Sequence, residues 1–161
     1  MNPFVNLFRS LARQVEQRRR VALCTVVGSY GSTPQAAGAA MLLHENMTTE
    51  GTLGRGCVEA EVPKRAFELL QRNESGLLTF QLDHDYGWDD GLICGGTMRV
   101  AVSTIRTEDE AVPFDSAASL LEKGVAADVT LRVGPYDKLE EYRLHIAAPA
   151  RLIIAGAGHV R

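Results

Sequence analysis

The chain has 161 residues, of which 45% are hydrophobic and 23% are charged, and its formal net charge is -3. This is the composition of an ordinary globular protein, and a weakly acidic chain without a basic stripe is a poor candidate for binding nucleic acid. No apolar run approaches the roughly 18 residues that a membrane-spanning helix needs, and the N-terminus lacks the pattern of a secretory signal, so we expect no membrane partner.

The N-terminal half predicts two helices and three strands. Asn2 and Pro3 are typical of an N-cap and a first helical turn, and apolar residues then recur at helical spacing as far as Val15. The continuous apolar run 21–27 predicts a buried strand that ends in a polar loop at 28–34. The remaining elements expected here are strands at 39–43 and 52–53 and a helix at 58–72, which contains Pro63.

The C-terminal half predicts more strands and one helix. The expected elements are strands at 77–82 and 98–105, a connection at 108–113, a helix at 114–123 that ends at Gly124, and hairpin strands at 129–133 and 142–146. His44 and His145 fall in strand segments and are expected to be half-exposed. The fold class predicted from this order is α/β, of the α+β kind, with a mixed sheet and flanking helices.

Residues 151–161 contain an apolar strand pattern followed by Gly156-Ala157-Gly158. A Gly-x-Gly after a strand opens a dinucleotide-binding unit, but the phosphates need the helix that follows it. We therefore expect the start of a truncated Rossmann domain and no complete NAD(P) site. The predicted organisation is an N-terminal domain at 1–107, a helix and hairpin extension or linker at 108–150, and this Rossmann start at 151–161.

Three glycine-rich loops, at 28–34, 54–57 and 94–96, adjoin apolar strands. Loops at the ends of neighbouring strands can converge on one site, and their exposed backbone N–H groups can bind anions. The side chains of Ser32, Thr33 and Arg55 would add donors suited to a phosphate or an oxyanion. Because glycine loops are often only turns, a purely structural role is the alternative for each loop taken alone.

Two of the three cysteines lie in these loops. Cys57 lies near a predicted helix start, which would lower the pKa of its thiol, and Glu59 lies two residues beyond. Cys94 precedes Gly95 and Gly96. Cys24 lies inside a buried strand pattern and is expected to be a core residue. An odd number of cysteines without close pairing favours reduced thiols and a cytoplasmic protein.

Four motifs carry a resemblance to a known family: Gly31-Ser32-Thr33-Pro34, Gly38-Ala39-Ala40-Met41, Gly54-Arg55-Gly56-Cys57-Val58-Glu59 and Leu92-Ile93-Cys94-Gly95-Gly96. In this order and spacing the chain resembles the N-terminal domain of the XdhC/CoxI family. Residues 151–161 resemble the entry into the C-terminal Rossmann domain of that family. The sequence departs from the family pattern at Gln35, where arginine is usual, and at Arg55, where glycine is expected.

The resemblance implies an accessory factor, or chaperone, rather than an enzyme. Members of the family bind the molybdenum cofactor, aid its sulfuration by a cysteine desulfurase, and insert it into apo molybdenum hydroxylases of the xanthine dehydrogenase type. The cofactor-binding residues it implies here are Gly31, Ser32, Thr33, Gln35, Arg55, Gly56, Cys57, Glu59, Cys94, Gly95 and Gly96. Cys57 and Cys94 would be the contacts to molybdenum, since thiolates are soft ligands. A second copy of this chain, in a homodimer, is a further expected partner.

Two alternatives remain open from the residues. The first is an enzyme that uses Cys94 or Cys57 as nucleophile, with His84 as the nearest base in sequence. The second is a structural module whose loops mediate dimerisation. His84 lies between Asp83 and Asp85, but the segment 83–90 lacks the spacing of metal ligands and is expected to be an exposed acidic loop.

Overall fold

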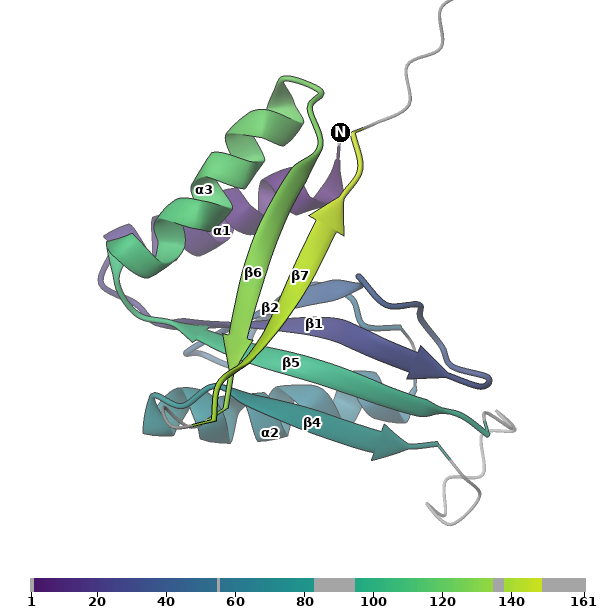
Figure 1. The fold of residues 1–161 in the computed structure, drawn as a ribbon. Helices are drawn as coiled ribbons and strands as arrows, with labels where there is room; N and C mark the ends of the chain where they lie inside the picture. Colours follow the sequence, from purple (N-terminus) through teal and green to yellow (C-terminus); the bar gives the residue numbers. More distant parts are fainter. Residues whose placement is uncertain (1, 55, 83–94, 135–137, 149–161) are drawn as a thin grey trace, which may run out of the picture.

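The computed structural model describes residues 2–54, 56–82, 95–134 and 138–148, which form three helices and seven strands (Figure 1). The helices are α1 (Pro3–Glu16), α2 (Cys57–Arg72) and α3 (Glu108–Glu122). The strands are β1 (Val21–Tyr30), β2 (Ala40–His44), β3 (Thr49–Gly51), β4 (Gly76–Gln81), β5 (Thr97–Ile105), β6 (Ala127–Val133) and β7 (Glu140–Ile146). Among these residues no helix has the length and apolar character needed to cross a membrane.

Five strands form one antiparallel sheet in the order β3-β2-β1-β5-β4, and β6 and β7 form a separate hairpin. The central pair is β1 and β5, with Val21 opposite Ile105 at one end and Tyr30 opposite Thr97 at the other. The register shifts between Val26 and Gly28, so the ladder contains a bulge at Val27. The α+β class with flanking helices is therefore confirmed. The expected mixed sheet is wrong, because every described strand pair in this sheet is antiparallel.

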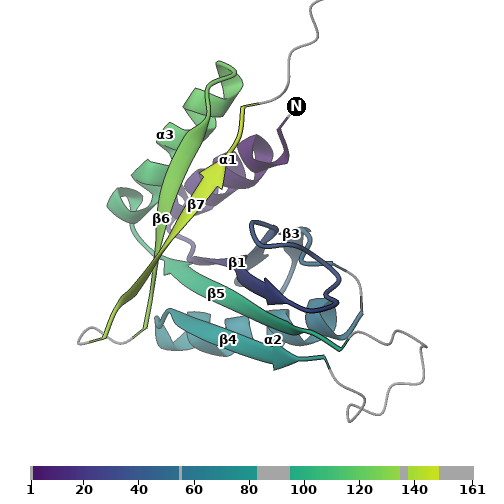
Figure 2. The same cartoon turned by 45° about the vertical axis from the view of Figure 1, so that its right-hand side comes forward.

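The sheet separates two apolar clusters, as the alternation along β1 dictates. Val21 and Leu23 pack in the cluster that also contains residues of α1, α3 and the hairpin. Ala22, Cys24 and Val26 pack in the second cluster, with residues of α2. The result is three layers, with α2 on one face of the sheet and with α1, α3 and the hairpin on the other (Figures 1 and 2).

The contact between α1 and α3 is built around Phe8, whose side chain is fully buried. Its ring centroid lies 5.5 Å from that of Phe4 and 5.4 Å from that of Phe114 in α3. The hairpin runs across the sheet rather than along it (Figure 2), and β6 alternates strictly between buried and exposed residues. Its buried residues join the cluster of α1 and α3, so these elements share one core.

The start of α1 confirms the prediction from its sequence. The side chain of Asn2 accepts a hydrogen bond of 3.0 Å from the backbone N–H of Phe4, and Pro3 occupies the first turn. The expected glycine after α3 is also found, since Gly124 has a φ of 73°.

The prediction that 108–113 is a connection is wrong, because α3 begins at Glu108. Thr107 caps the backbone N–H of Glu110, and the Glu110 side chain accepts from the backbone N–H of Thr107 in return. This capping box starts the helix five residues before Pro113, which lies inside it and is exposed. The buried side chains of Ala111 and Phe114 then hold the first turns against the core.

Two strand predictions also need correction. The first strand does not end at Val27 but continues through the bulge to Tyr30, because its last residues still pair with β5. The expected strand at 52–53 is wrong, since β3 is Thr49–Gly51. Leu53 lies after β3 and is buried in the apolar cluster between the sheet and α2.

His44 is not half-exposed as expected, since only 8% of its surface is accessible. Its Nε2 lies 2.8 Å from Oε1 of Glu50, which also accepts a hydrogen bond of 2.6 Å from the Ser10 hydroxyl. The pairing of β2 with β3 places Glu50 near this histidine, and the contact satisfies Nε2, whereas the buried Nδ1 has no hydrogen-bond partner among the described residues.

Candidate functional site

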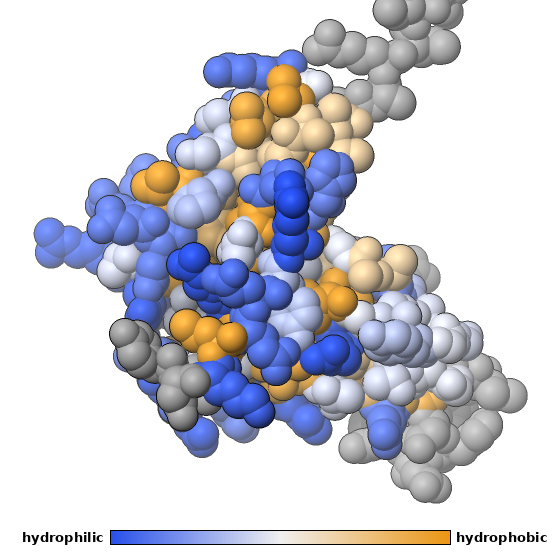
Figure 3. All heavy atoms as spheres, in the orientation of Figure 1, coloured by the Kyte–Doolittle hydropathy of each residue, from blue (hydrophilic) through white to orange (hydrophobic). Residues whose placement is uncertain are grey.

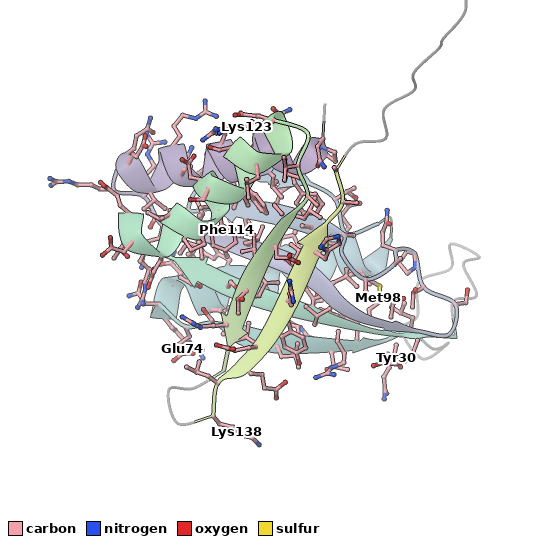
Figure 4. All side chains as sticks on the ribbon, turned by 45° about the horizontal axis from the view of Figure 1, so that its top comes forward. Tyr30, Glu74, Met98, Phe114, Lys123 and Lys138 are labelled. Atoms are coloured by element: carbon pink, nitrogen blue, oxygen red, sulfur yellow. The ribbon has the colours of Figure 1, made fainter. Side chains whose placement is uncertain are left out.

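The three glycine loops lie at one end of the five-stranded sheet. The loop at 31–39 follows β1, Gly95 and Gly96 precede β5, and Gly54 and Gly56 precede α2. Figure 4 marks this end by Tyr30, the last residue of β1, and Met98, near the start of β5. Tyr30 is 61% exposed, and Met98 is buried.

The first and third loops are in direct backbone contact. A Cβ atom on Gly31, whose φ is +72°, would lie 3.1 Å from the carbonyl oxygen of Gly95. A Cβ on Gly96 would lie 2.3 Å from the carbonyl oxygen of Ser32 and 2.6 Å from that of Tyr30. No side chain fits at Gly96 without displacing backbone, whereas a Cβ on Gly95 would meet no atom of the described residues within 4 Å. Glycine is thus required at position 96 by the approach of two loops.

The second loop meets the first at Gly54. A Cβ there would lie 2.9 Å from Cβ of Pro34 and 3.0 Å from Cγ of Gln35, and the φ of Gly54 is +107°. The parts of the three loops that the structure describes therefore adjoin one another, as their position in the sequence predicted. We call this arrangement the loop cluster.

Hydroxyl groups hold the first loop in shape. The hydroxyls of Ser29 and Thr33 are hydrogen-bonded to each other, and the backbone carbonyl of Gln35 accepts from Ser29 at 3.2 Å and from Thr33 at 3.1 Å. The side chain of Thr33 is therefore engaged within the loop, while Ser32 is exposed. Their predicted contacts to a cofactor remain predictions.

A second threonine braces the loop before α2. The Thr52 hydroxyl accepts from the backbone N–H of Gly54 at 3.1 Å and donates to Oε1 of Glu59 at 2.7 Å. Glu59 thus ties the first turn of α2 to the preceding loop. Sequence reasoning assigned Thr52 to a strand; the spacing Thr-x-Gly, in which a hydroxyl caps a turn, was the available signal.

The helix α2 begins at Cys57, after Gly56 with a φ of 96°. A glycine at the N-cap offers no side chain to the N–H groups of the first turn, so these groups can serve a ligand. The predicted position of Cys57 at a helix start is confirmed. The side chains of Cys57 and Arg55, and all of Cys94, His84 and the acidic loop, lie outside the described residues.

Cys24 is fully buried in β1, and burial raises the pKa of its thiol to about 12. An inaccessible thiol with so high a pKa is unreactive. We expect Cys24 not to react with a disulfide reagent at pH 8 in the native protein and to react fully in denaturant. The measurement is a thiol titration of the variant Cys57→Ser/Cys94→Ser, in which Cys24 is the one remaining cysteine; rapid reaction under native conditions would contradict the assignment.

Within the described ranges no three or more His, Cys, Asp or Glu side chains are grouped as metal ligands. The two described histidines are each paired with a carboxylate, His44 with Glu50 and His145 with Asp128.

Residues 14–81 match the model of the XdhC and CoxI family. The chain is 27% identical over 130 residues to a probable xanthine dehydrogenase subunit of Bacillus subtilis, an alignment that covers 80% of this chain and 39% of that protein. It is 32% identical over 99 residues to the uncharacterized protein YqeB of Escherichia coli, covering 62% of this chain and 18% of that protein. The chain thus spans well under half the length of these relatives.

The fold is also found in a solved structure. A crystal structure described as a xanthine dehydrogenase from Bacillus halodurans superposes with a TM-score of 0.68 at 21% identity, over 94% of this chain and 46% of that one. This likeness supports the fold. The match of residues 14–81 to the model of the XdhC and CoxI family agrees with the resemblance carried by the motifs at Gly31 and Gly54.

Proposed function

We propose that this chain is an accessory factor that binds the molybdenum cofactor transiently, aids its sulfuration, and helps to insert it into molybdenum hydroxylases of the xanthine dehydrogenase type. The observation that carries the proposal is the loop cluster. Two chain segments far from the first loop in sequence, at Gly54 and at Gly95–Gly96, are packed against it at one end of the sheet. The match of residues 14–81 to the XdhC and CoxI family model supports the link to xanthine dehydrogenase-related proteins.

The described residues fit the polar part of such a cofactor. The approach of Gly31 and Gly96 brings two backbone segments together without side chains, and none of the described residues fills the space beside Gly95. Backbone N–H groups in such loops, together with the first turn of α2, suit a phosphate. The hydroxyl of Ser32 is exposed and suits a phosphate or a pterin edge.

The described contacts also limit what each residue would do. Thr33 and Glu59 stabilise the loops through hydrogen bonds of their own, so their contribution is to hold the loop shape. Arg55 would supply positive charge for the phosphate. Cys57 and Cys94 would offer thiolates toward the metal. The cofactor itself would supply the molybdenum centre on which an oxo ligand is exchanged for sulfur.

In this role the chain would act through two partner proteins and would catalyse no reaction of its own. A cysteine desulfurase would deliver sulfur and an apo molybdenum hydroxylase would receive the cofactor. This implies a cytoplasmic protein. A homodimer is compatible with this role, and no catalytic residue is assigned.

Cofactor binding can be tested with the 161-residue chain directly. The chain is incubated anaerobically with molybdenum cofactor released from a purified molybdenum hydroxylase, separated by gel filtration, and analysed for molybdenum and pterin. We expect co-elution at up to one cofactor per chain. The variant Arg55→Gln should retain less cofactor, because it removes the charge that we assign to the phosphate.

The matched control is Arg72→Gln, which makes the same change in net charge in the last turn of α2, at the opposite end of that helix. It should bind as the parent does. Equal loss in both variants would indicate a general charge effect, and absence of molybdenum from the protein fraction of the parent would contradict cofactor binding by this chain.

A further inference from the structure

A cleft of about 220 Å³ lies between the hairpin and the sheet. Its walls are formed by Thr25–Val27 of β1 with Ala37 and Gly38 on one side, and by Leu131 and Tyr142–His145 of the hairpin on the other. Figure 3 shows the surface hollowed on its right side, between the hairpin and the end of the sheet. The cleft opens between two strand walls, a shape that suits a flat molecule.

One wall carries a buried polar group without a partner. Thr25 is 1% exposed, and its hydroxyl makes no hydrogen bond to any residue that the structure describes. Thr25 lies two residues after Leu23 in β1, so the two side chains are on the same face of the sheet. This is the face toward the hairpin, where the cleft lies. A buried hydroxyl without a partner is costly, and a ligand in the cleft would supply the missing hydrogen bond.

The charged groups beside the cleft are already compensated. The carboxylate of Asp128 accepts from Arg143 at 2.9 Å and pairs with Nδ1 of His145 at 2.9 Å. Hydrogen bonds from Arg143 and His145 lower the pKa of Asp128 to about 2, so this carboxylate stays ionised. The Tyr142 hydroxyl donates to Glu140 at 2.5 Å and accepts from Arg99 at 2.9 Å. An ionic ligand would have to displace one of these partners.

We propose that this cleft binds a small, uncharged, planar molecule that hydrogen-bonds the Thr25 hydroxyl and lies between Val27 on one wall and Leu144 on the other. A cavity of about 150 Å³ already accommodates benzene, so the cleft has room for one ring with a polar substituent. The inference rests on the cleft and on Thr25, and it is independent of the proposed function.

The test uses the complete 161-residue chain and three probes of one shape: benzamide, which is uncharged and polar; benzoate, which is charged; and toluene, which is apolar. Binding is followed by NMR shifts of the backbone amides of Val26, Gly38 and Leu144. We expect benzamide to bind with a Kd of about 1 mM, as its size allows, and benzoate to bind about tenfold more weakly.

Three variants locate the interaction. Thr25→Val keeps the shape of the side chain and should weaken benzamide about tenfold while leaving toluene unchanged. The control is Ser103→Ala, because Ser103 also carries a buried hydroxyl without a partner but does not line the cleft. It should leave both affinities as they are. Ala37→Leu adds an exposed side chain at the wall and should weaken both probes.

Several results would overturn the proposal. These are the absence of saturable shifts at the cleft residues with benzamide, equal affinity for benzoate, or unchanged benzamide binding in Thr25→Val. If Thr25→Val does not fold, unchanged benzamide binding in Ala37→Leu would overturn it equally. None of these measurements involves molybdenum cofactor, so failure here leaves the proposed function standing and the reverse also holds.

Discussion

Replacing Gly96 by alanine is expected to lower the free energy of unfolding by about 3 kcal/mol, the upper range for forcing a methyl group into a packed site. The added Cβ would lie 2.3 Å from the carbonyl oxygen of Ser32 and 2.6 Å from that of Tyr30. Both obstacles are backbone atoms, so the clash is relieved only if the first loop moves away from β5. The measurement is urea denaturation followed by far-UV circular dichroism.

Gly95→Ala is the matched control, since it adds the same methyl group one residue earlier, where no atom of the described part of the chain lies within 4 Å. Its unfolding free energy should stay within about 0.5 kcal/mol of the parent. Equal stability of the two variants would mean that the first and third loops do not touch in solution. A stable but cofactor-deficient Gly95→Ala would instead indicate that the open space beside Gly95 is used by the ligand.

The contrast between these two glycines illustrates what could be predicted from the sequence. The pair Gly95-Gly96 indicated a close approach of backbone, and the order of strands and loops indicated which end of the sheet would carry it. Which of the two glycines is required could not be predicted, because that depends on the carbonyl groups of a loop far earlier in the chain. The fold class followed from periodicity, which is a local property.

The misplaced elements have a common physical reason. The start of α3 was missed because 108–113 was interpreted as a connection, although Thr107 and Glu110 form a capping box that starts the helix at Glu108. His44 was predicted to be half-exposed because the sequence alone did not show that Glu50, on the next strand, is its hydrogen-bond partner. In each case a hydrogen bond outweighed the preference of a single residue, and such partners are brought together only by the folded chain.

In the loop cluster, residues that stabilise the loop conformation can be told apart from residues that are available to a ligand. Ser29, Thr33 and Thr52 have side-chain hydrogen bonds that end within the loops. Side-chain hydroxyls in a glycine motif suggested ligand contacts at Thr33, yet the described geometry gives it a bracing role. Under the proposed function, the groups that remain for a ligand are the backbone N–H groups, the Ser32 hydroxyl, Arg55 and the loop cysteines.

The second large effect is expected at those cysteines, and it depends on the proposed function. Replacing Cys57 and Cys94 together by serine removes both soft ligands while nearly keeping side-chain volume. We expect the variant to fold as the parent does and the transfer of sulfurated cofactor to fall about tenfold or more, the scale of changes close to a metal. The measurement is the activation of an apo molybdenum hydroxylase by the full-length protein carrying each variant.

Cys24→Ala provides the opposite pattern as a control. Because the Cys24 side chain is fully buried among Val26, Met41 and Val102, its loss should lower the unfolding free energy by about 1 kcal/mol and leave activation unchanged. The single variants Cys57→Ser and Cys94→Ser then show whether one thiolate carries the effect. If the double variant activates the client enzyme as well as the parent does, neither thiol contacts the metal, and Cys94 beside its two glycines serves only packing.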